Sequence, residues 1–360
     1  MSLTERLDDF QQAHPWLGFP IAVIYKYADD QGGYLAALIT YYGFLSVFPL
    51  LLLLSSVLGF VFQAYPNVQQ EILESALRQF PVIGDKLKGP EGLTGSTAAV
   101  VVGLLGSLYG ALGIAQATQN AMNIMWAVPR NRRPNPVTSR LRSLLLLATG
   151  GLTFLLTASL SGLGTTGFVL IRNGHDLVQT VITLVSIGLT AAYFVFLFRL
   201  STTRALSISD VLPGALAAAA LWQLLQTFGV AYVGSVVRNA DATNGVFAVV
   251  LGLIAWIYLA TVSLLFCVQV NVVHVRRLYP RTLLTPFTDD VDLTDADQRA
   301  YRSYARAQRT KDFESVDVSF DNEGQNATAR RLGKAARKTT PDPSDDEGGH
   351  PEANGPGEAR

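Results

Sequence analysis

Residues 35–62 form a stretch of 28 residues without a single Asp, Glu, Lys, Arg or His. A helix needs about 20 apolar residues to cross the hydrocarbon core of a bilayer, which is about 30 Å thick. The stretch is therefore long enough to be a transmembrane helix. The rest of the chain agrees with this interpretation, because the mean hydropathy is +0.28 and only 16% of the residues are charged.

Five further apolar stretches follow, and together they predict an all-α, polytopic membrane protein. The six expected spans cover residues 35–62, 96–125, 143–171, 178–198, 211–237 and 246–275. They make up a predicted transmembrane domain at residues 33–278. The polar segment between the first two spans, residues 63–95, holds apolar residues at helical spacing and predicts a short amphipathic helix that ends near Phe80.

The chain before the first span, residues 1–32, carries a short apolar run at residues 16–27. This run contains Pro20 and is not followed by a small-residue cleavage site, so we do not expect a cleavable signal peptide. It predicts a helix that lies along the membrane interface of a cytoplasmic N-terminus, with Trp16 and both tyrosines at headgroup depth. A gating role for this helix is the alternative.

The segment after the last span, residues 279–360, is polar and rich in Asp, Gly and Pro. Such a composition buries too little apolar surface to offset the entropy of ordering, and it predicts a mostly disordered cytoplasmic tail. A helix around residues 295–309 is the one element expected in it. The basic run at residues 330–338 has two interpretations, a solvated group of charges or a contact with anionic lipid.

The loops between spans differ in their Lys and Arg content, and this difference predicts the orientation of the spans. Arginines follow the second, fourth and sixth spans: Arg130, Arg132, Arg133, Arg140, Arg142, Arg199, Arg204, Arg276, Arg277 and Arg281. The opposite loops hold Arg172 and Arg238, besides the charge-balanced segment 63–95. We therefore expect a multi-pass protein of the plasma (inner) membrane with both termini in the cytoplasm.

Glycines mark one face of the second span. They are Gly103, Gly106, Gly110 and Gly113. Their spacing is typical of a helix that packs closely against a neighbour. Prolines mark two other spans, Pro49 inside the first and Pro213 in the first turn of the fifth, and each is a candidate kink or hinge.

Amides mark the adjacent face of the second span, at Gln116, Gln119, Asn120 and Asn123. Four amides facing lipid would be costly, so we expect them to face protein or water. Two interpretations stay open: hydrogen bonds between helices, or the lining of a polar cavity.

Groups that carry chemistry are scarce. No span has an Asp, Glu, Lys or Arg in its interior, which argues against proton-coupled carriers and voltage sensors. Cys267 is the single cysteine and no Cys/His cluster has metal-ligand spacing, which argues against a disulfide or a metal site. Outside the tail the paired acids are Asp8–Asp9 and Asp29–Asp30, and one of the latter is expected to cap the helix that enters the first span. With no phosphate-binding loop either, we expect no cofactor and no enzymatic activity.

Three segments resemble the YihY/virulence factor BrkB family of inner-membrane proteins: AALITYYGFLSVFPLLLLL (residues 36–54), LPGALAAAALW (212–222) and GVFAVVLGLIAWIYLATVSLLFCVQVN (245–271). The resemblance extends over residues 15–278. It implies a six-helix integral membrane protein with both ends in the cytoplasm, associated with envelope integrity or serum resistance. Members have also carried the label ribonuclease BN, which is considered a misassignment, and the absence of catalytic acids agrees with that view.

The chain departs from the family pattern near the end of the sixth span. The family commonly shows a GAELN-like sequence there, and the matching residues 267–271 read CVQVN. The family carboxylate is thus replaced by the neutral Gln269, which can still donate and accept hydrogen bonds. Any role of that acid in carrying protons or binding cations would be lost here.

The leading hypothesis is a protein that moves a lipid or another amphipathic envelope component across the membrane. The candidate cavity-lining residues are Gln116, Gln119, Asn120, Asn123, Trp256, Tyr258, Gln269 and Asn271. The alternative is a non-transporting membrane scaffold that recruits envelope machinery, and a ribonuclease is the third hypothesis. The expected partners are membrane lipids, with a second copy of the chain or envelope proteins as further candidates, and no nucleic acid.

The arrangement of the second and sixth spans separates the first two hypotheses. Amides of the second span that face Gln269 and Asn271 across an open, wet cleft would favour transport. Amides that are buried in hydrogen bonds would favour the scaffold.

Overall fold

The computed structural model describes residues 3–64, 97–166, 175–238, 245–283, 285 and 293–320. Every regular element within these residues is a helix. The amphipathic helix predicted between the first two spans and the basic run at residues 330–338 lie outside the described residues. Of the tail predicted to be mostly disordered, residues 279–360, the part beyond residue 320 also lies outside them, whereas residues 279–283 and 293–320 are described and include the buried Arg281.

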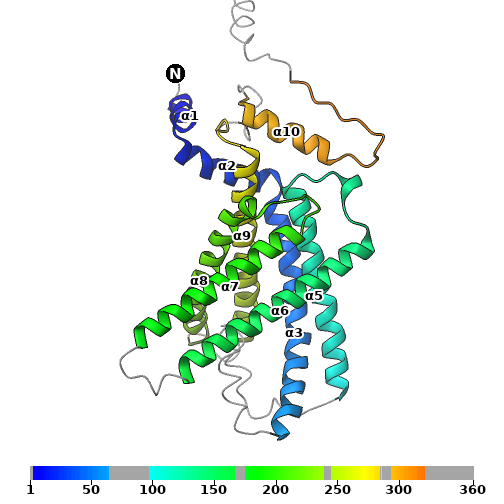
Figure 1. Ribbon diagram of the computed structural model, residues 1–360, viewed down its shortest axis with the longest axis vertical. Helices are drawn as coiled ribbons and strands as arrows, with labels where there is room; N and C mark the ends of the chain where they lie inside the picture. The colour runs from blue at the N-terminus through cyan, green and yellow to red at the C-terminus, as the bar shows by residue number, and fades with distance from the viewer. Residues whose placement is uncertain are drawn as a thin grey trace, which may run out of the picture.

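Six long helices form an elongated bundle (Figure 1). They are α3 (Gly32–Ala64), α5 (Thr97–Met125), α6 (Pro136–Thr166), α7 (His175–Leu200), α8 (Ile208–Arg238) and α9 (Gly245–Arg276). Each contains a segment of 21 to 27 residues that is long and apolar enough to cross a membrane: Gly32–Leu54, Val100–Met125, Pro136–Leu160, Thr180–Leu200, Ile208–Gly229 and Val250–Arg276. The predicted all-α fold with six membrane-crossing helices is therefore confirmed.

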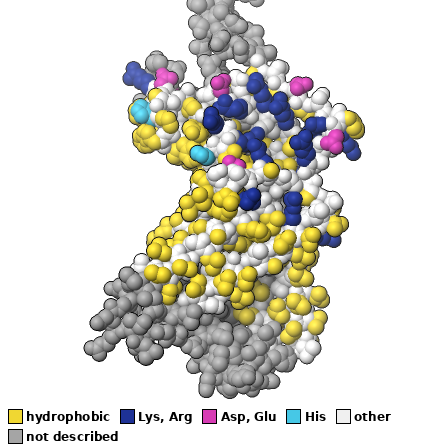
Figure 2. All heavy atoms as spheres, in the orientation of Figure 1, with side chains coloured by type: hydrophobic (Ala, Val, Ile, Leu, Met, Phe, Trp, Pro, Cys, Tyr) yellow, Lys and Arg dark blue, Asp and Glu magenta, His cyan; other side chains and the backbone are white. Residues whose placement is uncertain are grey.

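The outer surface of the bundle suits a bilayer. Only 17–28% of each apolar window is buried inside the protein, so most of these side chains face outward. Leu105, Leu155 and Leu251, for example, are all more than 60% exposed. Figure 2 shows this apolar surface along the bundle, whereas Lys and Arg side chains gather at one end. A surface of this kind is expected to face lipid.

Helix α6 begins at Pro136, before the predicted start of the third span at residue 143. The Oδ1 atom of Asn135 accepts the N–H of Thr138 at 2.8 Å and caps the first turn. An Asn cap followed by Pro starts a helix whatever the hydropathy of its first turns. Arg140 and Arg142 therefore lie on the helix and not in a loop.

The glycine face of α5 packs against α3. Gly103 faces Leu53, Gly106 faces Pro49, Gly110 faces Ser46 and Gly113 faces Tyr42. A Cβ atom at Gly110 would lie 2.5 Å from the Cβ of Ser46, and one at Gly103 would lie 2.7 Å from the backbone nitrogen of Leu53. Real Cβ atoms do not approach neighbours this closely, so the two helices can meet only because α5 has no side chains there.

Both candidate kink residues lie inside helices. Pro49 lies within α3, which continues to Ala64, and its ring contacts Gly106 of α5. Pro213 lies near the start of α8 and precedes Gly214, where α8 meets α9. Both prolines thus sit at helix contacts, and their role as hinges stays a prediction.

A polar layer, which we call the head, covers the end of the bundle where the charged side chains gather. It consists of α1 (Leu3–Ala13), α2 (Pro15–Asp29), the 3-10 helix η1 (Arg130–Arg132), α10 (Asp295–Ala307) and the connecting residues 277–283. Figure 1 shows α1, α2 and α10 at this same end of the bundle. The helices predicted at residues 16–27 and 295–309 are confirmed as α2 and α10, and α1 was not predicted.

Helix α2 packs one face against α9 and leaves the other exposed. Lys26 is fully buried on the packed face, whereas Trp16 is 67% exposed. The ring of Tyr27 stacks on Phe266 of α9 at 4.2 Å between centroids. The hydroxyl of Tyr25 donates to the carbonyl of Leu283 at 2.5 Å. The two tyrosines expected at headgroup depth therefore make contacts within the protein.

Candidate functional site

The amide stripe of α5, which consists of Gln116, Gln119, Asn120 and Asn123, connects α5 to other parts of the chain. Gln119 is 2% exposed, and its Nε2 donates to the hydroxyl of Ser143 at 2.8 Å and to the carbonyl of Ser139 at 3.2 Å. Its Oε1 accepts the Ser139 hydroxyl at 3.2 Å. The side chain of Gln119 is thus fully engaged in joining α5 to α6.

The other amides of the stripe point to different neighbours. The Oδ1 of Asn123 accepts the N–H of Thr203 and the hydroxyl of Thr202, each at 3.2 Å, in the loop between α7 and α8. The Oδ1 of Asn120 accepts a guanidinium N–H of Arg133 at 3.2 Å. The side chain of Gln116 is exposed and is not buried between helices. The four amides do not face one common cavity within the described residues.

Asn271 joins α9 to the start of α8. Its Oδ1 accepts the N–H of Gly214 at 2.7 Å, and its Nδ2 donates to the carbonyl of Val211 at 3.2 Å. A Cβ atom at Gly214 would lie 2.5 Å from that Nδ2, so the approach requires glycine. Pro213 has no N–H to complete the first turns of α8, and Asn271 supplies hydrogen bonds next to it.

Gln269 takes part in a buried cluster with Lys26 and Asp30. Its Nε2 donates to Oδ2 of Asp30 at 2.7 Å and to the backbone carbonyl of Lys26 at 3.4 Å. The ammonium of Lys26 donates to the same Oδ2 of Asp30 and forms an ion pair with it. It also lies 4.7 Å from the ring centroid of Tyr304 in α10. The cluster therefore joins α2, α9 and α10.

Asp30 corrects the prediction that an acid of the Asp29–Asp30 pair caps the first span. Asp30 is the C-cap residue that follows α2, and its side chain turns back to Lys26, one helical turn earlier. Burial lowers the pKa of Lys26 and raises the pKa of Asp30, although the attraction between the two charges opposes both shifts. The carboxylate that the BrkB resemblance assigns to position 269 is absent, but the carboxylate of Asp30 lies hydrogen-bonded to Gln269.

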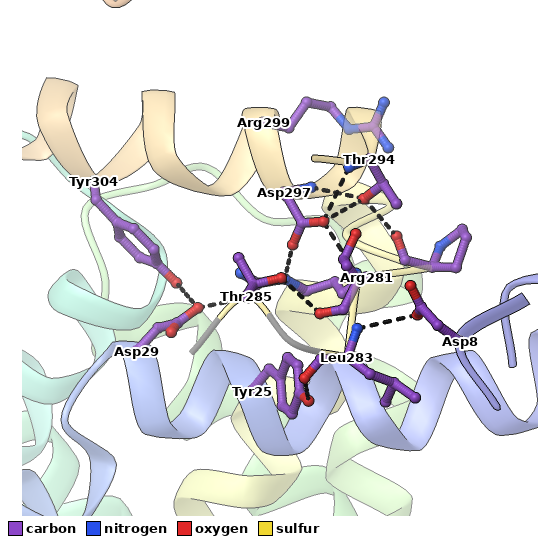
Figure 3. A network of polar contacts seen from close by, with 12 residues as sticks. Asp8, Tyr25, Asp29, Arg281, Leu283, Thr285, Thr294, Asp297, Arg299 and Tyr304 are labelled. Atoms are coloured by element: carbon purple, nitrogen blue, oxygen red, sulfur yellow. Dashed lines mark hydrogen bonds and ion pairs between the residues drawn. The ribbon is translucent and has the colours of Figure 1, made fainter. Parts of the chain in front are cut away.

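Arg281 holds the head together from the segment that follows α9 (Figure 3). It is 1% exposed, and its Nε donates to Oδ1 of Asp297 in α10 at 2.7 Å. Its Nη1 donates to Oδ2 of Asp29 in α2 at 2.5 Å, and the hydroxyl of Tyr304 donates to the same oxygen at 3.2 Å. Burial alone would lower the pKa of Arg281, but the two carboxylates outweigh burial and raise this pKa above its ordinary value.

Residues of α1 complete this network from the other side. The N–H of Leu283 donates to Oδ1 of Asp8 at 3.1 Å, and the side-chain amide of Gln11 donates to the carbonyl of Arg281 at 2.5 Å. Asp297 also accepts the N–H of Thr294 and forms a capping box with it at the start of α10. The segment 281–283 thus contacts α1, α2 and α10 at once, as Figure 3 shows.

A small apolar crevice lies between α7, α8 and α9. Phe194, Trp222 and Leu264 are among its lining residues, and Ser263 supplies a hydroxyl. Trp222 packs edge-on against Trp256, at 5.9 Å between ring centroids. None of the eight predicted cavity-lining residues lines this crevice.

The remaining predicted lining residues lie outside the crevice. Trp256 is half-buried beside Trp222, and its indole nitrogen has no hydrogen-bond partner among the described residues. Tyr258 is 40% exposed on the outside of α9. Within the described residues no group of three or more His, Cys, Asp or Glu side chains could hold a metal ion.

The buried charges of the head, Lys26, Asp30 and Arg281, were not predicted from the sequence as interacting residues. Its signal was the spacing of Lys26 and Asp30, which are four residues apart at the end of an apolar helical run. A lone Lys within such a run requires a partner. Arg281 gave no comparable signal, because an arginine after a span is already explained by the orientation of the spans.

The comparisons with known proteins agree with this architecture. The family model described as virulence factor BrkB matches residues 23–288. The chain belongs to the virulence factor BrkB family. The match includes all six spans together with Lys26, Asp30 and Arg281, whereas α1 and α10 lie outside it. The earlier resemblance to the BrkB family is therefore confirmed, and the chain is a multi-pass membrane protein.

Comparison with curated proteins and with solved structures found no match to this BrkB-family chain. The family and the six spans are thus supported by the family model together with the geometry of the helices.

Proposed function

We propose that this BrkB-family protein lies in the plasma (inner) membrane with its head in the cytoplasm and handles a lipid or another amphipathic envelope component. The orientation is supported by the arginines of the head, since positively charged loops stay on the cytoplasmic side. The α2 and α10 helices, near the two ends of the described chain, both belong to this head.

The observation that carries the proposal is the crevice between α7, α8 and α9. Ser263 lies 13 residues before Arg276, the head-side end of α9, which corresponds to about 20 Å along the helix. In the proposed arrangement the crevice lies at the depth of the hydrocarbon core, and its lining is mostly apolar. An apolar chain taken up from the bilayer is the ligand that such a lining favours.

The contacts of the amides on α5 limit which part of the ligand this proposal concerns. A polar path along α5 was the expected route for a headgroup, but Gln119 and Asn123 are engaged in hydrogen bonds between helices. Within the described residues the amides thus do not supply a polar route across the bundle. The proposed handling accordingly rests on the apolar part of the component and not on its headgroup.

A scaffold is the second candidate, and the same amides favour it. Gln119, Asn123 and Asn271 hold α5, α6, α8 and α9 at fixed positions, as expected of a rigid bundle. The head then serves as the surface that recruits envelope machinery. This role requires no lipid movement.

Reconstitution into liposomes with labelled lipids separates the two candidates. The substitution Ala260→Phe places a ring in the crevice, whereas Leu259→Phe changes the neighbouring, outward-facing position, which is 52% exposed. We expect lipid movement with the native chain, a loss with Ala260→Phe, and no change with Leu259→Phe. If the native chain moves no class of lipid, with or without a gradient, lipid movement is rejected and the scaffold is retained.

A further inference from the structure

Two arginines come together where the apolar bundle meets the head. Arg276 is the last residue of α9, and Arg204 lies in the loop between α7 and α8. The ends of α5 and α9 both contact the segment around this loop, because Asn123 of α5 accepts the N–H of Thr203 at 3.2 Å and Asn271 of α9 accepts the N–H of Gly214 at 2.7 Å. The guanidinium of Arg204 also lies over the ring of Trp126, 5.4 Å from its centroid, just after the end of α5. Three elements thus converge on this point.

Hydrogen-bond donors at this junction have no acceptor among the described residues. Nη1 of Arg276, Nε1 of Trp126 and the hydroxyl oxygen of Ser201 are all shielded from solvent and lack a partner. Ser201 opens the loop that carries Arg204. Buried polar groups are almost always hydrogen-bonded, so these unpaired donors near the head-side ends of α5, α7 and α9 require an explanation. Their common chemistry suits a ligand with several acceptor oxygens.

The carboxylates near this junction are already engaged. Asp30 attracts Arg276, but its Oδ2 accepts from Gln269 and Lys26. Asp210 attracts Arg204, but its Oδ2 accepts the N–H of Ser207 at 2.9 Å. Neither arginine forms an ion pair with an acid among the described residues. The positive charge of the pair is therefore available to an anion.

We infer that Arg204, Arg276 and Trp126 form a binding site for a phosphate group, from a lipid headgroup or from free phosphate. Guanidinium groups present several N–H donors in a plane, which matches phosphate oxygens, and an indole N–H adds a further donor. Arg204 is exposed and leaves the site open to a ligand. The site also lies where a lipid headgroup is expected, since the apolar spans of α5 and α9 end at Met125 and Arg276. This inference is independent of the proposed lipid handling, because a scaffold could hold a phosphate group equally well.

The test measures ligand-dependent thermal unfolding of the full chain in neutral detergent. One arm adds inorganic phosphate against chloride at equal ionic strength, and the other adds short-chain phosphatidylglycerol against diacylglycerol of the same chain length, which lacks the phosphate group. We expect the unfolding temperature to rise in at least one arm with a saturable midpoint. A rise with phosphatidylglycerol alone identifies a lipid headgroup, and an equal rise with inorganic phosphate identifies the free anion.

Variants show whether the effect belongs to this site. Arg204→Gln changes an exposed side chain and should raise the ligand concentration at the midpoint at least tenfold. Arg204→Lys should reverse part of this increase because the charge is kept. Arg132→Gln removes an exposed charge from η1 at the same end and should leave the midpoint within twofold. The inference is overturned if neither arm stabilises the native chain, or if Arg132→Gln raises the ligand concentration at the midpoint as much as Arg204→Gln does. This binding assay does not depend on lipid movement, so its failure is distinct from failure of the proposed function.

Discussion

The bundle and the head are held together by opposite kinds of contact. In the bundle, α5 meets α3 through glycines that bring backbone against backbone, without any charge. In the head, Lys26, Asp30 and Arg281 are buried, and each charge has a charged partner. Lipid is as apolar as Leu, so helices within it gain from close packing, whereas the head must satisfy every charge that it removes from water. The two parts should therefore respond differently to substitution.

The largest effect is expected in the head. Arg281→Met leaves the carboxylates of Asp29 and Asp297 without their counter-charge, which costs about 3–5 kcal/mol for a buried network. Denaturant unfolding measures this loss. Arg299→Met is the matched control, since Arg299 is exposed and donates only to a backbone carbonyl. Equal losses in the two variants would contradict the role assigned to Arg281.

A smaller effect is expected in the bundle. Gly110→Ala places a Cβ atom against Ser46 and should cost about 1–3 kcal/mol through overpacking. Gly151→Ala in α6 adds the same atom where no other atom lies within 4 Å, and should stabilise the helix by up to about 1 kcal/mol. Thermal unfolding in detergent distinguishes the two. A stabilising Gly110→Ala would mean that α3 and α5 are not in close contact.

The smallest effect is expected when both members of the Lys26–Asp30 pair are replaced together. Lys26→Met with Asp30→Leu removes both buried charges at similar volume, a change that is often neutral or stabilising. Unfolding of the double variant should thus stay within about 1 kcal/mol of the native chain. A loss as large as that of Arg281→Met would show that the pair is an essential part of the head.

The same double variant gives a pH test. The pKa of Lys26 is lowered in the folded protein, so between this lowered pKa and the ordinary value of 10.5 the unfolded chain binds more protons and stability rises with pH. The pKa of Asp30 is raised, so between the ordinary value of 3.8 and this raised pKa the folded protein binds more protons and stability falls as pH rises. Unfolding temperatures measured across both windows should show these slopes in the native chain and lose them in the double variant. Identical pH profiles would contradict the assignment.

The spans could be predicted because their signal is local. A run of apolar residues such as 35–62 indicates a membrane helix without any knowledge of its neighbours. The amides could not be assigned in advance, since their role depends on partners elsewhere in the chain, such as Thr203 for Asn123. The helices α2 and α10 of the head were predicted, but the charged contacts between them were missed for the same reason, because Gln269 is 239 residues from Asp30. Local hydropathy therefore predicts the helices of the bundle. The contacts of the head and of the amides depend on residues that are far apart in the chain, and local patterns do not reveal them.

The position of Arg281 in the chain imposes an order on assembly. A ribosome delivers α1 and α2 first, and their partners at residues 281–283 follow only after the sixth span has been synthesised. Until then the carboxylates of Asp8 and Asp29 and the hydroxyl of Tyr25 lack these contacts. The head can therefore close only in a chain whose six spans have all been synthesised.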